Sequence, residues 1–213
     1  AIAAFPTFSL AVANCDDKNF IKQFSATCRQ VLFFIIPLTA MIYFLRAQIV
    51  RLALGTELFS WYKTRLAAAS LGILALRLFS QSLLPLVARA FYAKKDTVRP
   101  VIVSFIAVAT NITLSLLLVN WLKSGVLRDF FSLVLKISDI PDIRIIGLAL
   151  SFTSASIINF FILFYLLHKK LGSCGGRKIY SSGIKILLSS LAMVAVIQLT
   201  KHFSVYLFEL NTF

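Results

Sequence analysis

The fold is decided by one stretch, Arg89-Ala90-Phe91-Tyr92-Ala93-Lys94-Lys95-Asp96-Thr97-Val98-Arg99-Pro100. It is short, basic and polar, and it lies between two long apolar runs, residues 66–88 and 101–122. Because charged groups are expensive in the hydrocarbon core of a bilayer, this stretch should form a turn at a membrane surface. The side on which the turn lies then sets the direction of every neighbouring span.

The composition points to a membrane protein. Hydrophobic residues make up 59% and charged residues 14% of the 213 residues, whereas soluble domains average about 45–50% and about 25%. Several apolar runs reach the roughly 20 residues that a helix needs to cross a bilayer. We therefore predict an all-α, polytopic transmembrane helix bundle that forms a single domain over residues 1–213. The expected spans are a partial N-terminal helix at 1–13 and five complete spans at 30–53, 66–92, 100–122, 144–167 and 184–207.

Between these spans we expect an interfacial helix at 20–29 and loops at 55–63, 123–144 and 168–183. Trp61 and Tyr62 should anchor the first of these loops at the membrane interface. Pro37 should kink its span, because its ring removes a backbone hydrogen bond.

The basic balance of the chain, a net charge of +14, has a membrane explanation. Lys and Arg cluster between the apolar runs, which favours anionic membrane lipids as partners and not nucleic acid. Twelve of the 22 lie on the side of the 89–100 turn, nine lie on the other side, and Arg77 belongs to neither. The positive-inside rule therefore places the turn in the cytoplasm. The three cysteines fall on the same side, in agreement with a reducing compartment.

Arg77 is the main candidate for a functional side chain, since it falls near the middle of a span. A charge at that depth costs at least about 2.5–3.5 kcal/mol and should face a partner or a wet cavity. Ser70, Arg77 and Gln81 share one helical face. They could form a polar lining for an anionic substrate such as a phosphate, which a guanidinium binds well. The alternative is a structural arginine bonded to carbonyl groups of a neighbouring helix.

Asn111 and Asn159 are polar residues in the middle of two further spans. We expect them to form interhelical hydrogen bonds, worth roughly 0.6–2 kcal/mol each, although ligand contact is an alternative. Gly147, Ser151, Ala155 and Asn159 recur every four residues, which predicts a small-residue stripe for close helix packing.

Within the turn, Asp96 and Thr97 can cap the following helix, and Pro100 suits its first turn. A second reading makes Arg89, Asp96 and Thr97 a gate that bonds to another lobe in one transport state. The chain lacks HExxH, phosphate-loop and GxSxG motifs and any His/Cys metal spacing. We therefore predict no enzymatic activity, no catalytic residue, no metal and no cofactor.

The turn resembles a signature of the MurJ (MviN) family of lipid II flippases. That signature is an Arg-Ala-Phe-Tyr-Ala block, two variable residues, Asp-Thr, one or two variable residues, and Pro. Residues 49–55, the position of Asn111, and residues 147–151 with Asn159 and 166–172 are similar to other helices of the family.

The resemblance implies the C-terminal part of a fourteen-helix protein, from the end of helix eight to helix thirteen. This part would belong to the second lobe of the two-lobe multidrug/oligosaccharidyl-lipid/polysaccharide exporter fold. It implies movement of lipid II from the inner to the outer leaflet of the bacterial inner membrane by alternating access, with the turn cytoplasmic and the N-terminal lobe as partner. The family's substrate-binding arginines lie mostly in the first lobe and in helix eight, so none is assigned in this chain.

Two alternatives stay open at this point. The chain could belong to an O-antigen-type polysaccharide flippase or a drug/cation antiporter of the same superfamily. It could also be a membrane scaffold that transports nothing.

Overall fold

The computed structural model describes residues 5–14, 16–54, 61–121, 144–171 and 176–207. These residues are helical apart from short turns, and five of their helices are long and apolar enough to cross a membrane. The predicted all-α, polytopic architecture is therefore confirmed. The helices are α1 (Phe5–Ala13), α2 (Asp17–Leu54), α3 (Trp61–Ala93), α4 (Val98–Trp121), α6 (Arg144–Leu171) and α7 (Gly176–Leu207).

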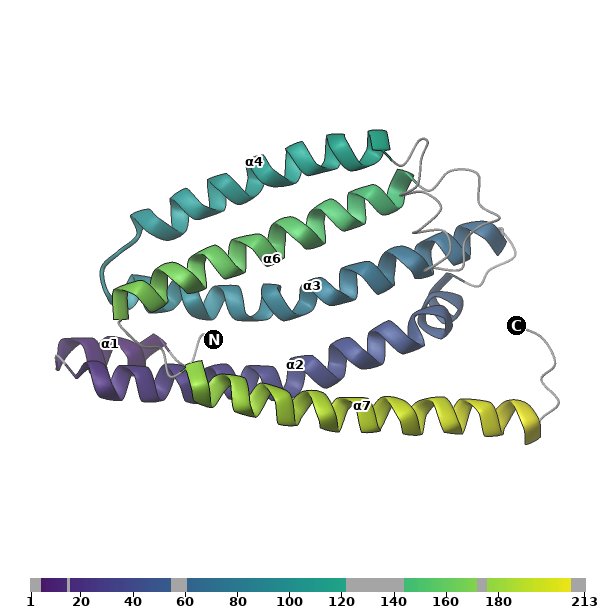
Figure 1. The fold of residues 1–213 in the computed structure, drawn as a ribbon, viewed down its shortest axis with the longest axis horizontal. Helices are drawn as coiled ribbons and strands as arrows, with labels where there is room; N and C mark the ends of the chain where they lie inside the picture. The colour runs from purple at the N-terminus through teal and green to yellow at the C-terminus, as the bar shows by residue number, and fades with distance from the viewer. Residues whose placement is uncertain (1–4, 15, 55–60, 122–143, 172–175, 208–213) are drawn as a thin grey trace.

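The five long helices lie side by side in the order α4, α6, α3, α2, α7 (Figure 1). This order differs from the order in the chain, because α6 lies between α4 and α3. The short helix α1 packs against α2 and α3. The turn between α3 and α4 marks one end of the array, on the left of Figure 1, which we call the turn end. The opposite end is the far end.

The best-packed region lies at the turn end. Phe8 of α1 contacts Phe20 and Phe24 of α2, with ring centroids 5.4 and 6.1 Å apart, and all three side chains are fully buried. Phe91 of α3 and Leu167 of α6 belong to the same apolar cluster. This cluster joins α1, α2, α3 and α6 where their turn-end segments meet.

Away from this cluster, many large apolar side chains are exposed. Phe34 and Phe105 have 72% and 73% of their surface accessible. Exposed apolar patches of this kind suit contact with lipid tails or with other protein segments.

The helices extend beyond the predicted spans, which corrects several boundaries. The predicted interfacial helix and first span form one helix, α2, of 38 residues that continues through Pro37. Trp61 and Tyr62 begin α3 and do not lie in a loop, and α7 begins at Gly176. At 1.5 Å per residue α2 is about 57 Å long, well over the hydrocarbon thickness of about 30 Å. Apolar runs mark the hydrocarbon core, whereas the polar residues beside them also sustain a helix.

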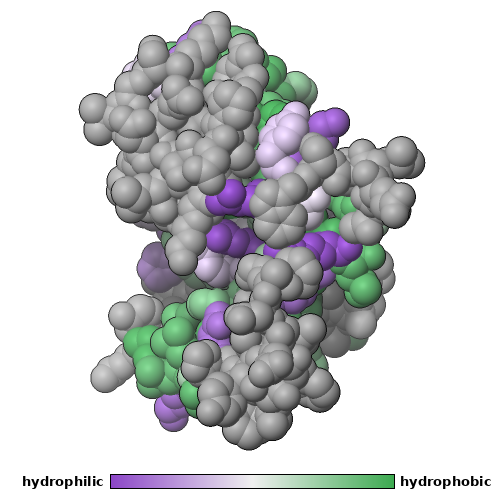
Figure 2. Space-filling model, turned by 90° about the vertical axis from the view of Figure 1, so that its right-hand side faces the viewer, coloured by the Kyte–Doolittle hydropathy of each residue, from purple (hydrophilic) through white to green (hydrophobic). Residues whose placement is uncertain are grey.

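Parts of the predicted loops, residues 55–60, 122–143 and 172–175, lie outside the described residues. The far end is seen end-on in Figure 2, where hydrophilic residues gather near the middle of the view with apolar residues above and below. Arg51 and Lys63 lie in the last turn of α2 and the first turn of α3 at this end. Polar groups thus mark both ends of the array, as two membrane surfaces require.

Candidate functional site

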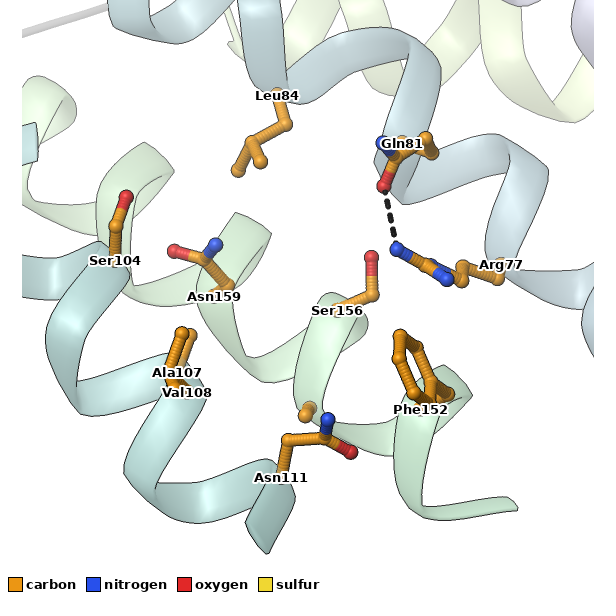
Figure 3. A pocket seen from close by; sticks show the side chains of 11 residues that line it. Arg77, Gln81, Leu84, Ser104, Ala107, Val108, Asn111, Phe152, Ser156 and Asn159 are labelled. Carbon is orange, nitrogen blue, oxygen red and sulfur yellow. Dashed lines mark hydrogen bonds between the residues drawn. The ribbon is translucent and has the colours of Figure 1, made fainter. Parts of the chain in front are cut away.

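A polar pocket of about 280 Å³ lies between α3, α4 and α6 (Figure 3). Arg77, one of its lining residues, lies 15 residues from the start and 16 from the end of the span Tyr62–Ala93. Phe152 and Leu84 contribute apolar wall. The polar lining consists of Arg77 and Gln81 from α3, Ser104 and Asn111 from α4, and Ser156 and Asn159 from α6.

Arg77 is only partly compensated within this pocket. Its Nη2 donates a hydrogen bond of 3.2 Å to Oε1 of Gln81, drawn as the dashed line in Figure 3. Its guanidinium carbon lies 4.9 Å from the centroid of the Phe152 ring, a cation–π contact worth roughly 0.5–2 kcal/mol. The Nε atom is buried and has no partner among the described residues. A guanidinium carries five N–H donors, so the described residues satisfy only a small part of its hydrogen-bonding capacity.

The two mid-span asparagines line the same pocket. In Figure 3 both side chains extend from α4 and α6 into the space between these helices. The Oδ1 atoms of Asn111 and Asn159 are buried and have no hydrogen-bond partner in the described part of the chain. An interhelical bond through these oxygens is therefore absent here, and the packing role stays a prediction.

Buried hydroxyl groups fix α3 against α6 beside the pocket. Ser80 is fully buried, and its Oγ lies 3.0 Å from Oγ of Ser156 and donates to the carbonyl of Arg77 at 3.0 Å. Thr153 donates across the same interface to the carbonyl of Ile73 at 3.2 Å. These bonds hold the backbone of Arg77 at a fixed place relative to the α6 side of the pocket.

Sequence reasoning missed five residues that line this site, of which Phe152 and Ser156 belong to α6; the others are Leu84, Ala107 and Val108. Phe152 and Ser156 share the helical face of Asn159, which lies seven and three residues further along α6. That spacing was the available signal. The predicted small-residue stripe is buried at Gly147, Ser151 and Ala155, in agreement with close packing of α6.

Ser70, predicted to join Arg77 and Gln81, lies elsewhere. It lines a separate apolar groove nearer the far end, with Val50, Leu66 and Ile145. Seven residues advance a helix by about 10 Å, so a shared face does not place Ser70 in the same pocket.

The turn is organised by Asp96, which joins three helices. Its Oδ1 accepts a hydrogen bond from the backbone N–H of Arg99 at 3.4 Å, which confirms the predicted cap of α4. Its Oδ2 lies 2.7 Å from Nζ of Lys170 at the end of α6 and 3.4 Å from Nε of Arg99. The hydrogen bond from Lys170 holds the pKa of Asp96 below its ordinary value, against the opposing effect of desolvation.

The end of α3 is closed by a left-handed residue. Lys95 has φ 56°, and the backbone N–H groups of Lys95 and Asp96 bond to the carbonyls of Tyr92 and Phe91. This is the Schellman arrangement, in which glycine is the usual residue at the Lys95 position. Lys94 lies 2.7 Å from Oδ1 of Asp17, which ties α3 to the start of α2.

The three gate candidates differ in their surroundings. Both oxygens of Asp96 are engaged within this array, and Thr97 is exposed. Nη1 of Arg89 is buried and has no partner among the described residues. A gating role for these residues stays a prediction.

Negative charge is confined to the turn end in the described part of the chain. The carboxylates there are Asp16, Asp17 and Asp96. Asp16 caps α2 through the N–H of Asn19 at 3.0 Å, and the other two pair with lysines. No carboxylate of the described residues is therefore free to pair with Arg77. These residues also contain no cluster of three or more His, Cys, Asp or Glu that could hold a metal ion.

Five helices long and apolar enough to cross a membrane, with a polar pocket between three of them, define a multi-pass membrane protein. The family model for lipid II flippase MurJ matches residues 1–213. A solved structure, "Lipid II flippase MurJ, inward closed conformation", is similar with a TM-score of 0.64 and 25% sequence identity. The similarity covers 92% of this chain and 36% of that chain, so this chain spans about a third of its length. A comparison with curated proteins gave no match. The chain belongs to the MurJ family of lipid II flippases, as its turn suggested.

Proposed function

We propose that the protein moves lipid II from the inner to the outer leaflet of the bacterial inner membrane by alternating access, and that this chain forms part of its second lobe. The observation that carries the proposal is the match of the MurJ family model along the whole chain, with the similar fold beside it. The N-terminal lobe of the same protein and anionic lipids are the proposed partners. The excess of Lys and Arg supports a cytoplasmic turn end.

The polar pocket suits this function in physical terms. A flippase must shield a charged headgroup from hydrocarbon, which takes fixed polar groups at membrane depth. Arg77 and Gln81 supply such groups in the middle of α3. We propose that they line the substrate pathway and that Ser70 contacts it nearer the far end. This work consists of binding and release, and it needs neither covalent chemistry nor a cofactor.

The charges of the pocket favour an anionic substrate over a cationic one. A drug/cation antiporter would be expected to place carboxylates at this depth. The carboxylates in the described part of the chain all lie at the turn end. The pocket instead offers the guanidinium of Arg77.

Depletion of the full-length protein tests the proposed function. We expect lipid II to disappear from the outer leaflet, as measured by its accessibility to an external lipid II-specific reagent. Normal export after depletion would overturn the proposal.

The pathway role of Arg77 is tested by complementation. We expect Arg77→Ala to lower export by about tenfold, equivalent to about 1.4 kcal/mol, with the protein still inserted in the membrane. Lys169→Gln, which removes one exposed positive charge outside the pocket, is the matched control. Unchanged export by Arg77→Ala would exclude the pathway role.

A further inference from the structure

We infer that Arg77 forms an oxyanion-binding site in the α3–α4–α6 pocket, and that it takes a phosphate or carboxylate group supplied from outside the described residues. This inference deepens the proposed function and rests on it only where the anion is the phosphate of a lipid substrate.

Arg77 keeps its positive charge inside the membrane. Arginine stays protonated in proteins, so burial does not neutralise it as it can neutralise lysine. Arg77 lies near the middle of its span, 15 residues from the start and 16 from the end, and half of a hydrocarbon core of about 30 Å is more than its side chain can bridge. Its charge must therefore be compensated where it lies.

The residues that contact Arg77 do not compensate its positive charge. Gln81 and Phe152 are both neutral, and Nε is buried without a partner. Helix α3 contains no carboxylate, and Asp96, 19 residues from Arg77 in the turn that follows α3, is already paired with Lys170. Charges at membrane depth normally have a partner, and the described residues supply no anionic one for Arg77.

The pocket has room for an oxyanion and is lined by hydrogen-bond donors from three helices. The space of about 280 Å³ is bounded by Arg77 on one helix and by Asn111 and Asn159 on the others (Figure 3). A planar guanidinium donates two parallel hydrogen bonds to a carboxylate or a phosphate. Each asparagine amide carries two N–H donors and one carbonyl acceptor, and its orientation can be exchanged. Arg77 and the two asparagines thus bring hydrogen-bond donors from three helices to the lining of one pocket.

Two other half-buried arginines in the described residues do not share this setting. Arg46 lies against Gly72 and over the Tyr43 ring, only eight residues before the end of α2, where a long side chain can reach toward the surface. Arg89 lies four residues before the end of α3. Depth, incomplete pairing and an adjacent cavity coincide at Arg77.

The test uses the full-length protein in mixed detergent–lipid micelles and measures its thermal unfolding midpoint. Geranyl diphosphate serves as the phosphate probe and geraniol as its uncharged control. The key variant is Gln81→Glu, because Oε1 of Gln81 already lies 3.2 Å from Nη2 of Arg77. This change supplies a permanent anion inside the pocket with almost no change in shape. Lys169→Gln is the matched charge control.

If a lipid phosphate is the anion, the diphosphate raises the midpoint of the wild type and geraniol does not. The dissociation constant rises at least about tenfold in Arg77→Gln. Gln81→Glu raises the midpoint without ligand and abolishes the response, whereas Lys169→Gln responds like the wild type.

If a carboxylate elsewhere in the protein is the anion, the wild type does not respond. Arg77→Gln then lowers the midpoint, and a second substitution that replaces this carboxylate by its amide restores it. Should Arg77→Gln fail to fold, Arg77→Lys and Gln81→Glu are measured in its place, because both keep a positive charge at position 77.

Two results would overturn the site. One is a diphosphate response that persists in Arg77→Gln. The other is no response at all together with an Arg77→Gln midpoint equal to that of Lys169→Gln. Neither result depends on lipid II export, so normal export after depletion, with an intact Arg77-dependent response, would reject the proposed function and keep the site.

Discussion

Replacing Asp96 by asparagine removes the charge that joins α4 to α6 while keeping the cap of α4, because asparagine is as good an N-cap as aspartate. The substitution therefore isolates the ion pair with Lys170, whose Nζ lies 2.7 Å from Oδ2 of Asp96. We expect the protein to lose stability at the turn end without losing the helix that follows the turn.

The magnitude follows from the burial of the pair. The side chains of Asp96 and Lys170 are 15% and 27% exposed. Fully exposed pairs contribute about 0–1 kcal/mol, whereas hydrogen bonds to charged groups contribute about 1.5–3 kcal/mol. An intermediate burial places the cost of Asp96→Asn at about 1–2 kcal/mol. Because the two residues are in contact, Lys170→Gln should add little in the Asp96→Asn background, with a coupling energy of about 1 kcal/mol.

A double-mutant cycle on the full-length protein measures this coupling through the free energy of unfolding in mixed micelles. Lys169→Gln, one residue before Lys170 and exposed, is the control and should change stability by less than about 0.5 kcal/mol. Strictly additive effects of Asp96→Asn and Lys170→Gln would show that the pair does not hold the helices together.

Lys95→Gly should stabilise the protein by about 0.5–1 kcal/mol in an unfolding titration, because glycine adopts φ 56° without strain; a loss of stability would contradict the Schellman assignment. Gly72→Ala should cost less than about 1 kcal/mol, because its Cβ would lie 2.5 Å from Nη1 and 2.9 Å from Cδ of Arg46, a flexible side chain that can move aside. The cost should largely vanish in an Arg46→Ala background, and an equal cost there would disprove the contact. The pKa of Asp96 is lower in the folded state than in the unfolded state. Its contribution to the free energy of unfolding is therefore complete above the unfolded pKa of about 3.9, and it is lost as the pH falls through the lower folded pKa. The unfolding midpoint of the wild type should therefore fall more steeply below about pH 4 than that of Asp96→Asn, and parallel curves would argue against this linkage.

The parts of the fold that depend on local chemistry could be predicted from the sequence. The turn, its Asp96 cap and the position of Arg77 in mid-span each follow from a few neighbouring residues. Helix ends were less predictable, because the apolar runs mark the hydrocarbon core and Trp61 or Gly176 can extend a helix beyond it. The distribution of apolar residues marks where the membrane core ends, and it does not mark where the helix ends.

The site could be predicted only in part, for a reason that concerns the order of the helices. Gln81 was placed with Arg77 because both lie on α3 within one turn. Asn111 and Asn159 were recognised as polar mid-span residues, yet their meeting with Arg77 depends on α6 lying between α4 and α3. Lipid-facing spans have similar sequences, so the apolar pattern does not show which helices lie next to one another. Ser70 lines a different groove from Arg77, because periodicity gives the face of a helix and not the position along it at which a neighbour covers that face.

The position of α6 between α4 and α3 also has a consequence for biosynthesis. The hydroxyl contact between Ser80 and Ser156 joins residues 76 positions apart, and that between Ile73 and Thr153 joins residues 80 apart. At about 5–20 residues per second, the ribosome needs roughly 4–15 s to make the missing partner after α3 has emerged. During that interval Arg77 enters the membrane without the Phe152 ring beneath it. We therefore expect α3 to stay at the insertion machinery, or beside a helper protein, until α6 arrives.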